Sequence, residues 1–320
     1  MLRSRIFWSA YSIDRYLSQT LDIPVGYQDT DVDVCPPGVE FHIEGSNMLR
    51  PDQEDLESVE LMSNTPARIS RAFSDYCRLA GQANELFIRT SKSQEVDRTA
   101  ILTVKAEIEA WWNFLPEGLT SNDEFVDLPF DNSAFFSVCY QHLLMLVNRP
   151  ALSLSPSNSE FRYALQSSLT SARTTLLLLT KQLTNSKHQK LFWPMYLYIV
   201  SMSGRIISCA CQLKLYSSAR GLKEIQLCIP LLENMTERWP LASNSIQYLQ
   251  TIISSLSASQ GQDNRPKKRP YDHYQMRDMG LNMTPIRNVS SRYSPENRSM
   301  DTPQGTVDIY TLDWVLVDGE

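Results

Sequence analysis

Two cysteines and four histidines are the residues best suited to bind a metal, but their spacing argues against a site. Cys209 and Cys211 stand two residues apart in an apolar stretch that predicts a helix. Side chains two residues apart on a helix point in directions that differ by about 200° around its axis, so these thiolates cannot bind the same ion. We expect both to pack in the core. No two histidines pair at metal-ligand spacing among His42, His142, His188 and His273. We therefore expect no metal or other cofactor in this chain.

A run of alternating acids resembles the start of a calcium-binding loop. Asp29, Asp31 and Asp33 occupy alternate positions, as the first three ligands of such a loop do. The sixth position is Val34, however, where the sharp turn of the loop requires glycine. The sequence therefore predicts a solvated acidic loop.

Signatures of nucleotide binding and of nucleophilic catalysis are missing from the sequence. All eleven glycines stand at least seven residues apart, which excludes glycine-rich phosphate loops and the Gly-x-Ser-x-Gly turn of hydrolases. Trp111 and Trp112 could line a ligand cavity, but an amphipathic helix buries one of two adjacent residues, so we expect core packing. The chain is predicted not to be an enzyme.

Apolar residues recur at helical spacing along most of the chain. The first helix is predicted to bury one stripe, formed by Leu2, Ile6, Ala10, Ile13 and Leu17. Further helices are predicted over 65–87, 101–115, 135–146, 161–183, 192–215, 225–239 and 246–256. The segment 192–215 is apolar nearly all round and should be central, and Pro230 should kink the helix that follows. No strand-type alternation recurs, so the prediction is an all-α, multi-helix bundle or array with a disordered C-terminal tail.

Composition and charge divide the chain into a helical domain over 1–256, with an acidic loop region at 22–66, and a tail over 257–320. The domain can bury a core, since 42% of all residues are hydrophobic. The net charge of −6 argues against binding nucleic acid through the overall field. The best candidate membrane span, Leu191 to Gly204, is shorter than the roughly 20 residues required, so we expect no membrane contact.

The tail begins with a basic segment. Residues 263–300 hold eight basic and four acidic residues. A cluster within 265–270 is typical of a nuclear-import signal and consists of Arg265, Lys267, Lys268 and Arg269. A solvated basic linker is the alternative. Proline follows Thr284, Ser294 and Thr302, which are candidate phosphorylation sites where added phosphate would offset the positive charge.

The tail ends with an acidic tip at 301–320, which holds five acids and no basic residue. Acids alternate there with aromatic and aliphatic residues, among them Asp308, Tyr310, Leu312, Asp313, Trp314 and Leu316. This composition is typical of an activation segment whose apolar groups enter a coactivator groove. An edge strand or a tail docked on the body is the alternative.

Three stretches of the chain resemble one family. The first runs from Arg5-Ile-Phe-Trp through the acidic loop, and its characteristic residues are Phe7, Trp8, Tyr11, Asp14, Arg15, Leu17, Pro24, Asp29, Asp31 and Asp33. The second is His142-Leu-Leu-Met-Leu-Val-Asn-Arg-Pro, and the third runs from Phe192-Trp-Pro to the Arg-Trp-Pro that ends at Pro240. Together they are similar to the fungal-specific transcription factor domain, the middle homology region of Zn2Cys6 binuclear-cluster regulators. The resemblance covers about residues 1–256.

The resemblance implies a transcription regulator that resides in the nucleus. The candidate partners are transcription coactivators, which the tip would bind, and a second copy or a related regulator in a homo- or heterodimer. The family reads DNA through an N-terminal module of six cysteines that holds two zinc ions. Here the first motif begins at Arg5, and the six cysteines of this chain lack the module's spacing. We therefore expect DNA contact only through a zinc cluster that is missing here or belongs to a partner. A natural regulator without the cluster and a truncated gene model both remain open.

We expect the residues of the first motif to have structural roles. Phe7, Trp8 and Tyr11 are large packing groups. Asp14 and Arg15 are adjacent and face different directions, so we expect each to pair with other helices or to cap loops. The motif is thus expected to be a scaffold, and the alternative is that its helix borders a regulatory pocket. Two other functions stay open: an all-α small-molecule-binding protein or enzyme, and a dimerisation partner that titrates full-length regulators.

Overall fold

The computed structural model describes residues 2–21, 23–37, 65–93, 95–120, 132–185, 191 and 193–263. Every regular element in these ranges is helical, which confirms the all-α prediction. The α-helices are α1 (Leu2–Leu21), α3 (Thr65–Ser93), α4 (Arg98–Asn113), α5 (Glu117–Thr120), α6 (Asn132–Asn148), α7 (Ser159–Asn185), α8 (Met195–Gln212), α9 (Ser218–Gln226), α10 (Cys228–Glu233) and α11 (Ala242–Asp263). Two 3₁₀ turns, η1 (Asp29–Asp31) and η2 (Pro150–Ser153), complete the set.

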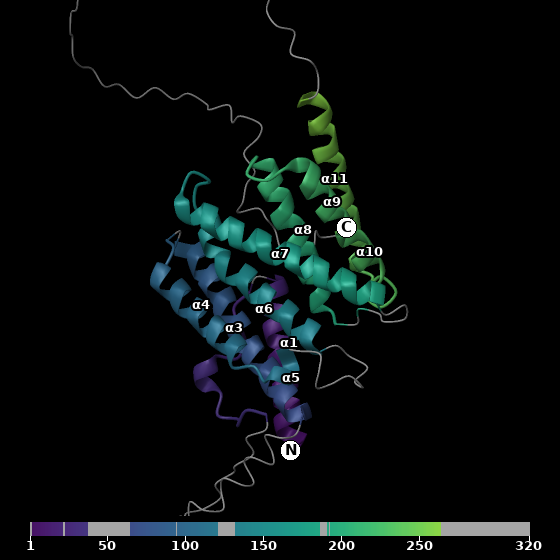
Figure 1. Ribbon diagram of the computed structural model, residues 1–320. Coiled ribbons are helices and arrows are strands. Elements are labelled where there is room, and N and C mark those ends of the chain that lie inside the picture. Colours follow the sequence, from purple (N-terminus) through teal and green to yellow (C-terminus); the bar gives the residue numbers. More distant parts are fainter. Residues whose placement is uncertain are drawn as a thin grey trace, which may run out of the picture.

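Helix α7 lies between two groups of helices (Figure 1). On one side α6 packs against α3, α4 and α5, and α1 packs against α3. On the other side α8 packs against α9, α10 and α11. Because α7 contacts both α6 and α8, one apolar core runs through the two groups.

The two central helices are α6 and α8. Helix α8 buries residues on all sides from Met195 to Cys211, as its apolar composition predicted. Trp111 of α4 is buried and Trp112 is half-buried, stacked 4.7 Å from the ring of Tyr140. The expectation that these tryptophans serve core packing is therefore confirmed.

Local signals explain several helix boundaries. Helix α3 begins at Thr65, directly before Pro66, as that pair predicted. The carboxylate of Asp97 caps α4 by accepting a 2.9 Å hydrogen bond from the Ala100 amide. Helix α11 extends to Asp263, beyond the predicted end near 256, because its last turns carry no apolar stripe for periodicity to detect.

The prediction of one kinked helix over 225–239 is wrong. The chain instead forms α9, which ends at Gln226, and α10, which ends at Glu233. Pro230 has no amide hydrogen to bond back to the carbonyl of Gln226, so the helical ladder is interrupted there. The segment 234–238 continues as turns.

Among the helices of the described ranges, none combines the length and apolar character needed to cross a bilayer.

Candidate functional site

The inner face of α1 is polar, which corrects the predicted buried stripe. Ile6, Ile13 and Leu17 are 60%, 57% and 44% exposed, and Ala10 is exposed too. The buried face instead carries Tyr11, Arg15, Ser18 and Gln19. Periodicity identified the helix but not the side that faces the core, because α3 presents polar partners and a gap that fits an arginine.

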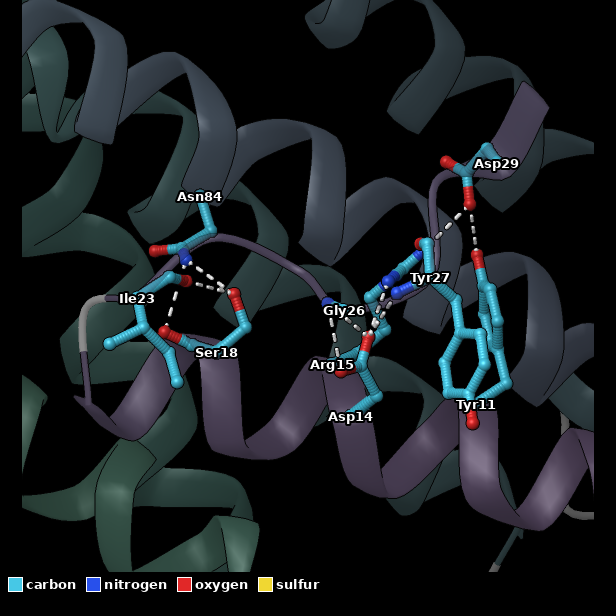
Figure 2. A network of polar contacts seen from close by, with 9 residues as sticks. All are labelled: Tyr11, Asp14, Arg15, Ser18, Ile23, Gly26, Tyr27, Asp29 and Asn84. Atoms are coloured by element: carbon cyan, nitrogen blue, oxygen red, sulfur yellow. Dashed lines mark hydrogen bonds and ion pairs between the residues drawn. The ribbon is translucent and has the colours of Figure 1, made fainter. Parts of the chain in front are cut away.

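Arg15 is the centre of a polar network between α1 and the loop that follows it (Figure 2). The Arg15 side chain is 2% exposed. One terminal nitrogen, Nη1, donates to Asp14 Oδ2 over 2.8 Å. The other, Nη2, donates to Asp29 Oδ1 over 2.6 Å and to the carbonyl of Tyr27 over 2.8 Å. The buried charge is therefore satisfied by two carboxylates and one backbone oxygen, as a buried cation requires.

Asp14 binds the loop that follows α1 by accepting hydrogen bonds from its backbone amides. Its Oδ1 accepts from the Gly26 amide over 2.9 Å, and its Oδ2 also lies 3.4 Å from the Tyr27 amide. Asp14 thus caps a loop and Arg15 reaches one, as expected. The two side chains do not simply face different directions, however, because they also pair with each other.

Tyr11 completes the network. Its hydroxyl donates to Asp29 Oδ1 over 2.5 Å, and the Arg15 guanidinium lies 4.2 Å from the centre of its ring. Burial raises the pKa of Tyr11, and the hydrogen bond to Asp29 adds to that effect, so the phenol stays protonated. Burial on its own lowers the pKa of Arg15, but Tyr11 and Asp29 outweigh it and the net shift is upward.

Two glycines, which we did not predict as part of the site, permit this packing. A Cβ at Gly81 of α3 would lie 2.7 Å from Arg15 Nε, and a Cβ at Gly26 would lie 2.7 Å from Asp14 Oδ1. Side chains at these positions would displace the two charged groups. An isolated glycine inside a helical pattern often marks a close approach, and Gly81 carried that signal.

The network continues to the second motif through Asn84 of α3. Its amide nitrogen donates to Ser18 Oγ over 2.9 Å, and its amide oxygen lies 3.5 Å from Nη1 of Arg149. Ser18 in turn donates to the carbonyl of Ile23 over 2.6 Å. Arg149 is 3% exposed and stacks 3.7 Å from the ring centre of Phe87. Residues far apart in the sequence thus meet on one face of α3.

The remaining residues of the first motif lie around this network. Trp8 donates from Nε1 to the carbonyl of Cys35 over 2.9 Å, and Phe7 packs edge-on against Trp8, so both are packing groups as expected. Pro24 is exposed in the loop. Asp29, Asp31 and Asp33 are all exposed, as the prediction of a solvated acidic loop requires, and Asp29 in addition bonds to the network.

The candidate metal ligands within the described ranges have packing roles. No group of three or more histidine, cysteine or acidic residues in those ranges is arranged to hold a metal ion. His142 is fully buried, and its Nδ1 lies 2.8 Å from the hydroxyl of Tyr76. Cys211 is buried and Cys209 half-buried in α8. Burial raises the pKa of each thiol to about 11, which leaves them protonated and poor ligands.

Several predicted features lie outside the described residues. They are the loop beyond 37, His42, His188 and His273, the basic cluster at Arg265, Lys267, Lys268 and Arg269, the sites Thr284, Ser294 and Thr302, and the tip with Asp308, Tyr310, Leu312, Asp313, Trp314 and Leu316.

The network holds three segments together. The two terminal nitrogens of its guanidinium have acceptors, its phenol is protonated, and its carboxylates receive backbone amides or Arg15. This arrangement joins α1, the loop 23–35 and α3 into one unit, which agrees with a scaffold role for the motif.

Comparison with known proteins identifies relatives of one kind. The chain is 33% identical over 308 residues to a protein named "Probable transcription factor FUP6" of Fusarium proliferatum, an alignment covering 83% of this chain and 43% of that protein. It is 26% identical over 154 residues to an uncharacterized transcriptional regulatory protein of Schizosaccharomyces pombe, covering 47% of this chain. It is 24% identical over 165 residues to the transcriptional activator protein acu-15 of Neurospora crassa, covering 48% of this chain.

The chain spans less than half the length of these relatives, with 18% and 16% of the latter two covered. No family model and no solved structure matches it. The relatives are named as transcription factors, regulators and activators and not as enzymes, which agrees with the prediction that this chain is not an enzyme. The chain is therefore a homologue of fungal transcription regulators.

Proposed function

We propose that this chain is the regulatory and activating portion of a fungal regulator of the zinc-cluster family, acting on RNA polymerase II transcription in the nucleus. The observation that carries the proposal is the alignment with the Fusarium transcription factor over 83% of the chain. The motif resemblance over the first 256 residues supports the assignment to the zinc-cluster family.

In this proposal the helical body and the tail have different tasks. The acidic tip at 301–320 recruits a coactivator through its aromatic and aliphatic residues, as short amphipathic segments do in apolar grooves. The cluster at 265–270 directs nuclear import. DNA is contacted by a zinc module that lies outside these 320 residues or belongs to a partner regulator in a homo- or heterodimer. The body, held together by the network around Arg15, exposes or restrains the tip.

A reporter assay tests the activating role. The full chain is fused to a heterologous DNA-binding module in yeast, and reporter output is compared with that of the same fusion lacking 301–320. We expect the deletion to abolish activation, and Tyr310→Ala or Trp314→Ala to lower it by at least about fivefold, because aromatic residues dominate such interfaces.

Tyr293→Ala provides the matched control, since it removes the same side chain from the tail outside the tip. Its reporter output should equal that of the unaltered fusion at equal protein level. Activation that survives loss of the tip, or that falls equally with Tyr293→Ala, would contradict the proposal.

Nuclear import is tested separately. A fluorescent fusion of the full chain should lose nuclear accumulation when Lys267 and Lys268 are both changed to Gln. Changing Arg287 and Arg292 to Gln removes the same charge from the same tail and should leave accumulation intact. Equal loss in both variants would assign the effect to tail charge in general.

A further inference from the structure

Helix α1 carries a row of exposed apolar residues on the side that faces away from α3. The row, which we name the α1 stripe, consists of Ile6, Ala10, Ile13, Leu17 and Leu21. Its four large members are between 42% and 60% exposed, and Ala10 is exposed too. At 100° per residue, all five stand between about 120° and 180° around the helix axis from Arg15, which faces α3. A contiguous exposed apolar row is typical of a surface that a partner covers.

The spacing of the α1 stripe indicates that the partner is another helix. From Ile6 to Ala10, Ile13 and Leu17 the steps are four, three and four residues. These are the steps between successive a and d positions of a coiled coil, where one helix packs lengthwise against a second. Residues with this spacing face one neighbouring helix along the whole seam.

The same spacing reads identically in both directions about a point between Tyr11 and Ser12. An antiparallel copy of α1, related by a twofold axis at that point, would place Ile6 opposite Leu17 and Ala10 opposite Ile13. A small residue would thus meet a large one on each side of the axis, which lets the side chains interdigitate. A twofold interface requires a surface that is complementary to itself, and the α1 stripe meets this requirement.

A cavity extends the apolar surface at the C-terminal end of the stripe. It has a volume of about 260 Å³ and lies between α1, α8 and the segment 239–245. Its apolar lining includes Leu17, Leu21, Leu197, Trp239 and Leu241. Leu241 is 48% exposed, so the cavity reaches the surface beside the stripe. In the antiparallel arrangement the N-terminal half of the second α1 lies over this opening, where Ile6 of the second copy can pack.

The charges of α1 favour the antiparallel over the parallel arrangement. Arg3 and Arg5 are exposed in the first turns, and the stripe itself holds no charged residue. An antiparallel copy places these two arginines at the C-terminal end of the other helix, where the backbone carbonyls carry a partial negative charge. A parallel copy would instead bring four arginines together at one end.

The area of the stripe is sufficient for a weak dimer. A 20-residue helix is about 30 Å long and 10 Å across, so the half of its cylinder that faces a partner presents about 470 Å². Two copies therefore bury about 940 Å² through α1, and contact with the rim of the cavity at Leu241 adds to this. Specific interfaces bury at least about 1,000 Å² in total, and those near this limit belong to weak complexes.

We propose that two copies of this chain associate through the α1 stripe, with the two helices antiparallel across a twofold axis. The inference gives a surface to the homodimer named in the proposed function, and it rests on that function to this extent. Association is measured directly, without a reporter, so the dimer and the role in transcription can fail independently of each other.

Sedimentation velocity of the full chain tests the association. Between about 1 and 300 µM we expect a monomer–dimer equilibrium with a dissociation constant of about 10–100 µM. Ile13→Asp should weaken the dimer by at least about tenfold, because it places a charge at the apolar centre of the interface. Leu102→Asp makes the same kind of change at a leucine of α4 that is 65% exposed and should leave the equilibrium unchanged. Thermal unfolding verifies that both variants are folded.

Disulfide cross-linking tests the orientation without relying on Ile13→Asp. In a Cys35→Ser background, a mixture of Ile6→Cys and Leu17→Cys chains should form a cross-linked dimer under mild oxidation. Ile6→Cys alone should not, because its two copies stand 11 residues, or about 16 Å, apart along the antiparallel pair. A disulfide requires Cα atoms within about 7 Å of each other.

Several results would overturn the proposal. They are a monomer at every concentration, equal effects of Ile13→Asp and Leu102→Asp, and cross-linking of Ile6→Cys with itself in place of Leu17→Cys. Deleting 264–320 should leave the equilibrium unchanged. A full chain that is monomeric and associates only after this deletion would show that its own tail covers the stripe, which also contradicts the proposal.

Discussion

Gly81 of α3 lies directly against the guanidinium of Arg15 of α1, so closely that a Cβ there would stand 2.7 Å from Arg15 Nε. The arginine cannot move aside easily, because two carboxylates and a carbonyl already hold its terminal nitrogens. The glycine therefore determines how deeply the arginine can be buried.

Gly81→Ala should destabilise the protein. Overpacking of this kind costs about 1–3 kcal/mol, which exceeds the gain of up to about 1 kcal/mol expected from replacing glycine in a helix. Urea unfolding measures the difference in the free energy of unfolding. In an Arg15→Ala background the same substitution should become stabilising, since only the helix-propensity gain remains. Destabilisation in both backgrounds would show that the contact with Arg15 is not the cause.

Asp29→Asn should lower the free energy of unfolding by about 1–2 kcal/mol, a value kept modest because the side chain is 34% exposed. The substitution removes a charged acceptor from both Arg15 and Tyr11. Asp31→Asn makes the same chemical change two residues later at an exposed position and should stay within about 0.5 kcal/mol of the unaltered protein. Equal effects would contradict the special role of Asp29.

Acid should destabilise the protein through His142. Burial, with a further contribution from the charge of Arg149, lowers the pKa of this histidine from 6.5 to about 3. The unfolded chain therefore binds a proton at a higher pH than the folded chain does. The stability held by neutral His142 is complete above about pH 6.5 and falls toward pH 3, by up to about 1.4 kcal/mol per pH unit.

His142→Gln removes the titrating group and keeps a polar partner for Tyr76. Urea unfolding between pH 4.5 and 7.5 should show a slope below pH 6.5 that is shallower in the variant than in the unaltered protein by about 1.4 kcal/mol per pH unit. Parallel pH dependences would exclude His142 as the source.

The cysteines should differ in their reactivity toward alkylating reagents according to how deeply each thiol is buried. Burial raises the pKa of Cys77 and of Cys228 to about 12, so neither forms the reactive thiolate at neutral pH. Cys35 is half-buried in the loop after α1. Iodoacetamide labelling followed by mass spectrometry should modify Cys35 first and spare Cys77 and Cys228 until urea unfolds the chain. Early labelling of either would contradict the packing described for α3 and α10.

The sequence predicted the helices well because most bury an apolar stripe, and α8 was recognised as central because it is apolar on all sides. It predicted the inward face of α1 wrongly. Periodicity records where apolar residues stand, but the burial of Arg15 depends on Gly81 and Asp29, and no local pattern links those three. Asp29 entered the candidate site through a family resemblance, and its partners became visible only when the chain was folded.

Hydrogen bonds depend strongly on the distance and direction between two atoms, whereas contacts between apolar surfaces do not. Apolar packing alone would therefore allow more than one register between two helices. The polar underside of α1 therefore admits a single register against α3, in which Arg15 faces Gly81 and Ser18 faces Asn84. Inserting one residue between Arg15 and Ser18 would rotate the two parts of α1 relative to each other by about 100°, so that Arg15 and Ser18 could not face Gly81 and Asn84 at the same time. Helix α1 can therefore pack on α3 in one position only, and the segments that contact α1 are positioned with it.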